Sequence, residues 1–445
     1  MSILAAALPL LALLAKADNY AVLIAGSSGY SNYRHQADVC HAYQILVRNG
    51  VSADNIITFS YDDVANSRDN PFPGKLFNKP TEEGTPGVDV YEGCKIDYSG
   101  RDVTPDNFLA ALKGDSSKAS GKVLKSGAED RVFINFADHG APGLIAFPHS
   151  ELHADDLIDA LKYMNENKMY SELVFYLEAC ESGSMFEDKL PEDIKIYATT
   201  AANAHESSWG TYCPPSSKVD GKNLNTCLGD LYSVNWMEDA DLANTTESLD
   251  DQFQKVKTET SKSHVMEYGE LDFDSQKADS FWGKVAAPAI RYSKVDPSIK
   301  TASAVDSRDV GLTTFYSQYL NSDPRDLKNR RRLAEKLVAE IQFRQWSDEL
   351  FSKIAAKVMM SNNGMLSDAL YGHRKPVSFQ CHKAAIKQYK SVCGELTDYS
   401  LKHVRVLVNL CEITKDTESV TNGIKEQRIS TVVEVLFIDR YANSN

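Results

Sequence analysis

The sequence lacks an excess of basic residues, a second long apolar run and internal repeats. Its formal net charge is −14, which argues against nucleic acid as a partner, because binding phosphates requires a basic surface. After the N-terminal segment no run reaches about 18 apolar residues, so we expect no membrane span further along the chain. The glycine-bearing segment at residues 26–29 matches neither the dinucleotide-binding fingerprint nor the Walker pattern.

A zinc-protease signature is also missing. His149 and His153 are four residues apart, a spacing that can place two zinc ligands on one face of a helix. Glu151, however, stands in the wrong place for either order of the zinc-protease motif. We interpret both histidines as surface residues at the start of a helix, and we expect no metal and no cofactor.

The composition predicts two domains of different charge. The 445 residues are 42% hydrophobic and 25% charged, as in a globular protein that is too long for one core. From Ser322 to the end, 20 Lys and Arg face 15 Asp and Glu, a balance of +5, which leaves −19 for the rest. This difference favours electrostatic docking of the two modules. The alternative is that two modules simply differ in charge.

The N-terminus has the pattern of a signal peptide. Residues 3–14 are almost all alanine and leucine, and Ala15-Lys16-Ala17 offers a small-x-small cleavage site. We predict a signal peptide over residues 1–17, although the basic n-region is missing, with a buried N-terminal helix as the alternative. The protein is therefore expected to be soluble and to be lumenal or extracellular.

Strand-like and helical patterns alternate in the first two thirds of the chain. Helical stripes around Val39–Val47, Thr104–Leu112 and Leu152–Met164 separate the runs that we expect to be strands. These runs are Tyr20–Ala25, Asn55–Phe59, Arg131–Phe136, Leu173–Leu177 and Ile194–Ala198. Such alternation predicts an α/β fold, with a mostly parallel sheet covered by helices on both faces. Residues 60–100 read as a loop, residues 286–309 as an aperiodic linker, and the remainder as a small all-helical module.

A histidine and a cysteine each follow one of the buried strands. Asp138-His139-Gly140 comes after the run at 131–136, and Glu178-Ala179-Cys180 after the run at 173–177. The 41 residues between His139 and Cys180 leave room for one helical crossover, so the two strands can be neighbours. An imidazole beside a thiol supplies the thiolate nucleophile. Backbone N–H groups of Gly140 and Cys180 can stabilise an oxyanion. The pattern predicts a cysteine hydrolase.

The other cysteines are harder to pair. Cys213 and Cys227 flank one loop and are plausible partners, and Cys381, Cys393 and Cys411 form an odd-numbered group. We interpret Cys40 as a buried free thiol and find no partner for Cys94.

Several ordered motifs resemble the legumain, or asparaginyl endopeptidase, family of the caspase-like clan. They are Tyr33-Arg34-His35-Gln36-Ala37-Asp38, Asp138-His139-Gly140, Glu178-Ala179-Cys180-Glu181-Ser182-Gly183-Ser184 and Tyr197-Ala198-Thr199-Thr200-Ala201-Ala202. The match is strong over about 19–270 and looser in the C-terminal module. It implies a caspase-like α/β catalytic domain (18–285), a linker and activation segment (286–321) and a helical C-terminal prodomain (322–445).

The resemblance also implies roles for individual residues. Cys180 would be the nucleophile, His139 the general base and acid, and Asn32 the residue that orients the histidine. The specificity pocket would draw on Arg34, Glu178, Ser207 and Asp230, with His35 close by. A guanidinium and carboxylates suit the carboxamide of asparagine, which has both an acceptor and a donor. Aspartate would be accepted once acid neutralises it.

The family further implies a zymogen that cleaves itself after Asn321 at acid pH and is inhibited by its own prodomain. Protein and peptide substrates and cystatin-type inhibitors are the partners to expect, in lysosomes, endosomes or an acidic lumen. The acyl-enzyme can also pass to an amine, which is peptide ligation. No cysteine follows Cys411, so we expect one prodomain disulfide, Cys381–Cys411. Asn244 opens a glycosylation sequon.

Two rival interpretations remain. A transamidase that attaches lipid anchors would be favoured by a C-terminal membrane span, and none is seen. A catalytically inactive binding or inhibitor protein is the other, against which stands the presence of both Cys180 and His139.

Overall fold

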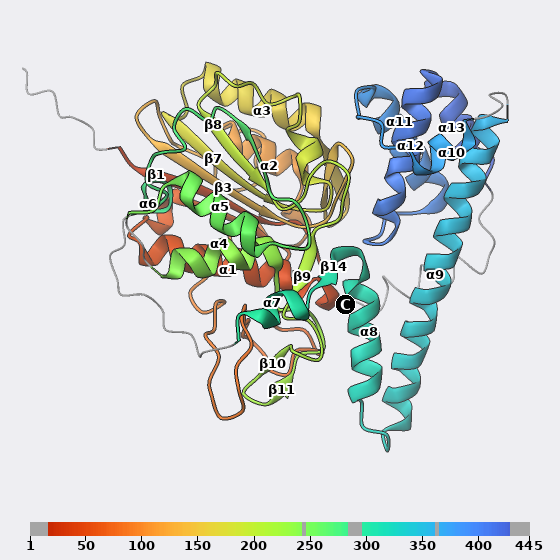
Figure 1. The fold of residues 1–445 in the computed structure, drawn as a ribbon, viewed down its shortest axis with the longest axis horizontal. Helices are drawn as coiled ribbons and strands as arrows, with labels where there is room; N and C mark the ends of the chain where they lie inside the picture. The colour runs from red at the N-terminus through yellow and green to blue at the C-terminus, as the bar shows by residue number, and fades with distance from the viewer. Residues whose placement is uncertain (1–16, 243–245, 284–295, 361–364, 428–445) are drawn as a thin grey trace, which may run out of the picture.

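The computed structural model describes residues 17–242, 246–283, 296–360 and 365–427 (Figure 1). The predicted signal peptide up to residue 16 and the sequon asparagine, Asn244, lie outside these ranges, as do the first ten residues of the predicted linker.

A six-stranded sheet forms the centre of the N-terminal domain. Its order is β13-β8-β7-β3-β1-β2, and only the edge strand β13 is antiparallel to its neighbour. The strands are β1 (Asn19–Ala25), β2 (Ile56–Ser60), β3 (Arg131–Ala137), β7 (Glu172–Glu178), β8 (Ile196–Thr200) and β13 (Met266–Gly269). The apolar runs are buried on both faces, as parallel strands between helices require. The predicted α/β fold class is confirmed.

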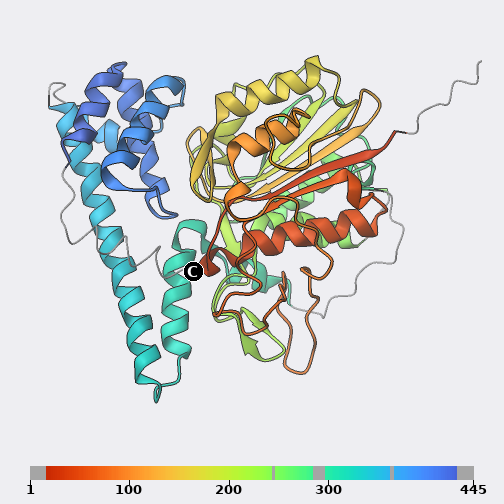
Figure 2. The same ribbon diagram turned by 180° about the vertical axis from the view of Figure 1, so that it is seen from behind.

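Helices cover both faces of this sheet (Figures 1 and 2). On one face, α2 (Pro105–Leu112) and α3 (Ala154–Glu166) pack against Val22, Ile24, Val132 and Ile134. On the other face, the alternate residues Ala21, Leu23 and Phe133 meet a second group of helices. These are α1 (Tyr33–Arg48), α4 (Leu231–Asp241), α5 (Leu249–Glu259) and α6 (Asp279–Trp282). Adjacent residues of one strand therefore serve two separate cores.

Local signals set the helix starts. Thr104 Oγ1 accepts from the Asn107 N–H at the start of α2, where Pro105 is the first helical residue, as the sequence predicts. The third predicted helix starts later than expected, at Ala154, because residues 150–153 form strand β6 (Ser150–His153). His153 is buried, not on the surface as we had interpreted it.

Three small sheets lie outside the main one. β4 (Gly140–Ala141), β5 (Leu144–Phe147) and β6 form the first, and β10 (Lys218–Val219) with β11 (Lys222–Asn223) the second. The third joins β12 (Gly229–Asp230) and β14 (Val305–Asp306) on either side of β9 (Trp209–Thr211). The part of the predicted linker that the structure describes is thus regular, since it contains α7 (Ser298–Ala302), β14 and α8 (Val310–Asn321).

The described part of the C-terminal module is all helical, as predicted. After α8 the chain turns into the long helix α9 (Leu327–Met359), which Figure 1 shows running from the α8–α9 turn to a helical bundle. The bundle contains α10 (Leu366–Tyr371), α11 (Phe379–Cys393), α12 (Val404–Thr414) and α13 (Thr417–Lys425). Its core includes Phe351, Ile354, Tyr389 and Leu407. Among the described residues, no helix is both long and apolar enough to cross a bilayer.

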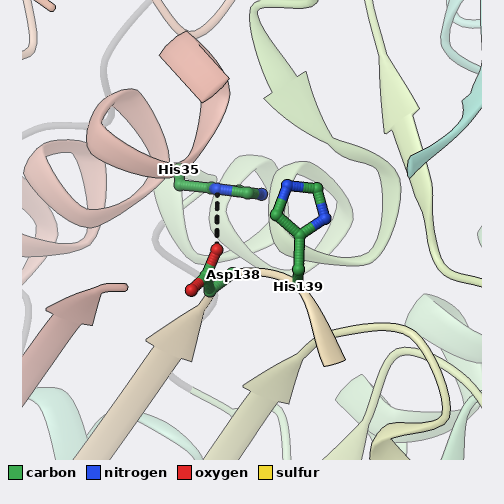
Figure 3. A group of neighbouring side chains, drawn as sticks. All are labelled: His35, Asp138 and His139. Carbon is green, nitrogen blue, oxygen red and sulfur yellow. Dashed lines mark ion pairs between the residues drawn. The ribbon is translucent and has the colours of Figure 1, made fainter. Parts of the chain in front are cut away.

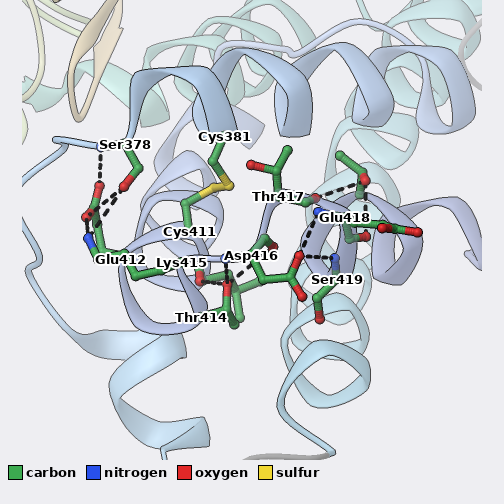
Figure 4. The surroundings of a disulfide bond; sticks show 12 residues. Ser378, Cys381, Cys411, Glu412, Thr414, Lys415, Asp416, Thr417, Glu418 and Ser419 are labelled. Carbon is green, nitrogen blue, oxygen red and sulfur yellow. Dashed lines mark hydrogen bonds and ion pairs between the residues drawn. A yellow bond between two sulfur atoms is a disulfide. The ribbon is translucent and has the colours of Figure 1, made fainter.

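Three disulfide bonds cross-link the described chain. Cys213–Cys227 and Cys381–Cys411 are present, and the second joins α11 to α12 beside the capped start of α13 (Figure 4). The third, Cys40–Cys94, contradicts our interpretation of Cys40 as a free thiol and of Cys94 as unpartnered. It ties α1 to the loop of residues 60–100. Cys180 and Cys393 are free and buried.

We predict that replacing Cys40 and Cys94 together by alanine costs more stability than removing Cys213 and Cys227. The first bridge spans 54 residues and the second 14. Because a disulfide limits the freedom of the unfolded chain, we expect the free energy of unfolding to fall by about 4 kcal/mol without the first bridge and by about 3 kcal/mol without the second. Urea unfolding followed by tryptophan fluorescence measures both losses. An unchanged unfolding midpoint for the Cys40/Cys94 variant would contradict this prediction.

Candidate active site

His139 and Cys180 lie beyond the carboxyl ends of neighbouring strands. In the β3–β7 ladder Ala137 pairs with Glu178, so each of the two residues follows its paired position by two. Gly140 packs directly against the nucleophile turn, since a Cβ built on it would lie 2.4 Å from the carbonyl oxygen of Cys180. The structure therefore brings His139, Gly140 and Cys180 to one edge of the sheet.

The turn after Cys180 has an unusual backbone. Glu181 has a φ of 49°, in the left-handed region, a conformation that a non-glycine residue adopts only when its surroundings hold it there. Here Ala202 and Glu206 carbonyl oxygens accept from the N–H groups of Gly183 and Glu181. These bonds hold the sharp turn that carries Cys180.

The Cys180 thiol is buried and protonated in this form of the protein. The Ser208 N–H donates to its sulfur over 3.3 Å. Burial raises the pKa of Cys180 to about 11, and nearby Arg308 only partly offsets this effect. A thiol with this pKa is a poor nucleophile at neutral pH until a base removes its proton.

His139 is held as a neutral base. Asn32 Nδ2 donates to the Ser28 carbonyl, which turns Asn32 Oδ1 toward His139 Nε2 at 2.9 Å. His139 Nε2 then carries the hydrogen, and Nδ1, which has no hydrogen-bond partner in the described chain, is free to take a proton. Burial lowers the pKa of His139 to about 4, although Asp398 of the C-terminal module, 3.6 Å away, acts in the opposite direction.

The predicted pocket residues gather around one buried guanidinium. Arg34 Nε donates to Asp230 Oδ1 at 2.7 Å, and Arg34 Nη2 donates to Ser307 Oγ at 2.7 Å. Glu178 Oε2 accepts from both the N–H and the hydroxyl of Ser233 at 3.0 Å, while Glu178 Oε1 has no partner among the described residues. Burial and nearby Asp230 raise the pKa of Glu178 well above its ordinary value.

His35 lies between this group of residues and His139. Its Nε2 lies 3.4 Å from Asp230 Oδ2, and its ring meets that of His139 edge to face, with ring centroids 5.0 Å apart. Burial and Arg34 keep the pKa of His35 well below its ordinary value, so it is neutral. Ser207 is partly exposed, and its neighbour Ser208 makes the contact to Cys180 instead.

One group of side chains has the composition of a metal site. Figure 3 shows His35 reaching from α1 toward Asp138 and His139 at the end of β3, with candidate ligand atoms within 4.8 Å of one another. His35 Nδ1, however, is 2.6 Å from Ser27 Oγ and 3.4 Å from Asp138 Oδ1. That nitrogen is already engaged, so we assign the group to the hydrogen bonding of the catalytic edge.

The chain's own residues cover the site. β14 pairs antiparallel with β9, and the next residue, Ser307, donates its N–H to the Ser208 carbonyl and accepts from Arg34. Arg308 then donates to the Gly140 carbonyl at 3.0 Å and to Glu181 at 2.6 Å. Sequence reasoning missed Ser307 and Arg308, because they stand in an aperiodic stretch far along the chain.

The C-terminal module also contacts the N-terminal domain through ion pairs away from the site. Lys375 pairs with Asp188 at 2.5 Å, Lys383 with Asp155 at 2.8 Å, and Lys390 with Glu151 at 3.2 Å. In each pair the lysine belongs to the C-terminal module and the carboxylate to the N-terminal domain. This arrangement favours electrostatic docking over an incidental difference in charge.

Comparisons with known proteins agree over both modules. Residues 19–284 match the model of the peptidase C13 family, and residues 335–427 match that of the legumain prodomain. Legumain of Bos taurus is 43% identical over 404 residues, 88% of this chain and 89% of the relative. A vacuolar-processing enzyme of Citrus sinensis is 42% identical over 407 residues, 88% of this chain and 81% of the relative. Caspase-1 of Spodoptera frugiperda aligns with 57% of this chain and 88% of that one, at 10% identity and a TM-score of 0.33, too low to support an argument.

We predict that Gly140→Ala lowers kcat at least about 100-fold, because the new methyl group displaces the backbone N–H groups that would stabilise an oxyanion. Gly311→Ala is the matched control, since a Cβ there meets nothing within 4 Å. Turnover of a peptide substrate is compared after both variants are shown to melt like the wild type. Equal kcat in the two variants would show that Gly140 does not contribute to an oxyanion site.

Proposed function

Because the chain belongs to the peptidase C13 family, we propose that this cysteine endopeptidase cuts peptide bonds after asparagine, and after aspartate in acid. The observation that carries the proposal is the buried group of Arg34, Glu178 and Asp230. The hydroxyl of Ser307 already accepts a hydrogen bond from Arg34 there. The matches to the peptidase C13 family and to legumain confirm the family resemblance and the class of enzyme. The preference for asparagine is our proposal.

The pocket has the right polarity for a carboxamide. Ser307 Oγ accepts from Arg34, and the carbonyl oxygen of a substrate asparagine would take that place. Its NH₂ group would then meet Glu178 Oε1, which lacks a partner, and Asp230. An ionised aspartate would add negative charge beside carboxylates whose pKa values are already raised, so it would enter only when acid protonates it.

The catalytic steps follow from the geometry. His139 Nδ1 would take the thiol proton, and the Cys180 sulfur would attack the backbone carbonyl carbon of the asparagine, whose bond to the next residue's nitrogen then breaks. The N–H groups of Gly140 and Cys180 would stabilise the oxyanion. Protonated His139 would give its proton to the leaving amine, and water would then hydrolyse the thioester. An incoming amine in place of water would give peptide ligation.

The covered site would be opened by cleavage after Asn321. This residue ends α8, and its side chain donates to Asn225 Oδ1 and to the Ser317 carbonyl at 2.9 Å each. A cut there separates the basic bundle from the catalytic domain along the chain, but the ion pairs still hold the bundle in place. Release would then depend on pH.

Histidines at the interface would supply part of that pH dependence. Burial lowers the pKa of His153 to about 4 and that of His382, on the opposite module, to about 3. His205 and His373 form a second pair across the interface, with ring centroids 5.2 Å apart and both pKa values lowered by burial. Separated histidines bind protons near pH 6.5, so docking weakens as the pH falls below that value.

Opening at acid pH fits a lysosomal, endosomal or secreted acidic setting. Cystatin-type inhibitors would compete with the substrate at the edge of the pocket formed by β9. The rival functions differ in one measurable property: an inactive binding protein would hydrolyse nothing, and a transamidase would require an amine acceptor.

The specificity test uses the acid-treated full chain and three peptides that differ only before the scissile bond. We expect cleavage after asparagine, at least about 100-fold slower cleavage after glutamine, because one added methylene misplaces the amide in a polar pocket, and cleavage after aspartate only near pH 5 or below. Cys180→Ala is the control and should be inactive. Equal cleavage after asparagine and glutamine would end the proposed specificity.

The activation test follows prodomain release against pH. We expect His382→Phe to shift the midpoint of release to lower pH by about half a unit, because it removes a group that docking keeps unprotonated. His264→Phe is the control, since His264 is exposed and pairs with Glu206 of its own domain. Adding Asn321→Ala to each chain separates undocking from cleavage, and mass spectrometry maps the new C-terminus in the unmodified chain. A midpoint that His382→Phe leaves in place would exclude this histidine from the response.

A further inference from the structure

A second buried carboxylate stands behind the specificity pocket. Asp38 is one helical turn after Arg34 on α1 and is fully buried. Its Oδ2 accepts from the backbone N–H of Asp230 at 3.1 Å, and its Oδ1 accepts from Asn78 Nδ2 at 2.6 Å. Asp38 thus holds the backbone of a pocket residue without itself reaching the pocket guanidinium by a hydrogen bond.

Asn78 connects Asp38 to a histidine. Its Nδ2 donates both to Asp38 and to the Leu228 carbonyl at 2.9 Å. Two acceptors on the nitrogen side fix the orientation of the amide, so Asn78 Oδ1 faces His41 Nδ1, 2.8 Å away.

His41 continues the connection along α1 toward the surface. Its Nε2 faces Asp241 Oδ2 at 2.9 Å, and Asp241 Oδ1 accepts from Arg48 at 2.7 Å. Both ring nitrogens therefore face acceptors, which requires a protonated imidazole. Asp241 accordingly raises the pKa of His41 against the effect of burial.

The backbone before Asp230 is packed tightly on this network. A Cβ built on Gly229 would lie 2.8 Å from Asn78 Nδ2 and 3.0 Å from Asp38 Oδ1. Only glycine fits there, so a shift of Asp38 or Asn78 would be passed directly to the next residue, Asp230.

Two other buried carboxyl groups lie near Asp38. Asp230 on β12 and Glu178 on β7 both face it, and Arg34 on α1 is already paired with Asp230. Burial, first, and the Asp230 charge, second, raise the pKa of Asp38 well above its ordinary value.

We propose that Asp38 is a positioning residue for the specificity pocket: anchored by Asn78 and, through it, by His41, it fixes the backbone of Asp230 and thereby sets how strongly the pocket prefers a carboxamide to a carboxylate. The inference rests on the proposed asparagine specificity and names a residue that acts behind it.

Asp38→Asn tests this role with little change of shape. In the variant, an NH₂ group replaces one of the two carboxylate oxygens of Asp38. Either the Asp230 N–H or Asn78 Nδ2 then loses its hydrogen-bond acceptor. The acid-matured full chain is assayed at pH 5 and pH 6 on peptides with asparagine or aspartate before the scissile bond. We expect the ratio of kcat/KM values, asparagine over aspartate, to fall roughly tenfold, with the loss in KM for the asparagine peptide.

Two further variants keep the test decisive. Asn78→Leu disconnects Asp38 from His41 without touching the pocket and should lower the same ratio. Thr260→Val removes a buried hydrogen bond of similar kind, from Asn235 on α4, and should lower the melting temperature but leave the ratio unchanged. Partial unfolding lowers kcat for both peptides together and cannot change their ratio.

The outcomes separate the two proposals. If the wild-type enzyme does not favour asparagine, the proposed function fails. If it does, and either Asp38→Asn or Asn78→Leu folds and keeps the wild-type ratio at both pH values, the role of Asp38 is overturned.

Discussion

The guanidinium of Arg34 is the contact on which the rest of the active edge depends. It pairs with Asp230, contacts Asn32 Oδ1 at 3.2 Å and donates to Ser307. Asp230 is one of the candidate pocket residues, Asn32 contacts His139, and Ser307 lies in the segment that covers the site. A buried cation with buried acids around it is tolerated only while its partners stay in place. One buried cation therefore joins three separate parts of the structure.

The meeting of His139 and Cys180 at one edge of the sheet could be predicted from the sequence, because apolar runs show where the strands end. Apolar runs that end in Asp138-His139-Gly140 and in Glu178-Ala179-Cys180 belong to buried parallel strands, and the carboxyl ends of such strands meet at one edge. The burial of Ala21 and Val22 on opposite faces likewise follows from the two-residue period of a strand. Pattern and geometry agree for the parallel strands of the main sheet.

Other features depend on contacts that no local pattern records. Cys40 lies among apolar residues of α1 and reads as part of the core, so its bond to Cys94 depends on where an aperiodic loop folds back. Ser307 contacts Arg34 across 273 residues, and β14 is only two residues long. His153 was misplaced because it is buried by the C-terminal module, where Phe379 packs against its ring. Each error has the same origin, a long-range contact.

The segment that covers the site belongs, by its attachment, to the catalytic half of the molecule. Residues 305–321 precede the proposed cut, so they would stay on the catalytic fragment as its new C-terminal tail. A tethered tail acts at an effective concentration in the millimolar range, whatever the dilution of the enzyme. Every incoming substrate would therefore compete with an internal ligand, and the freshly cut enzyme would respond weakly to dilute substrates until that tail is removed.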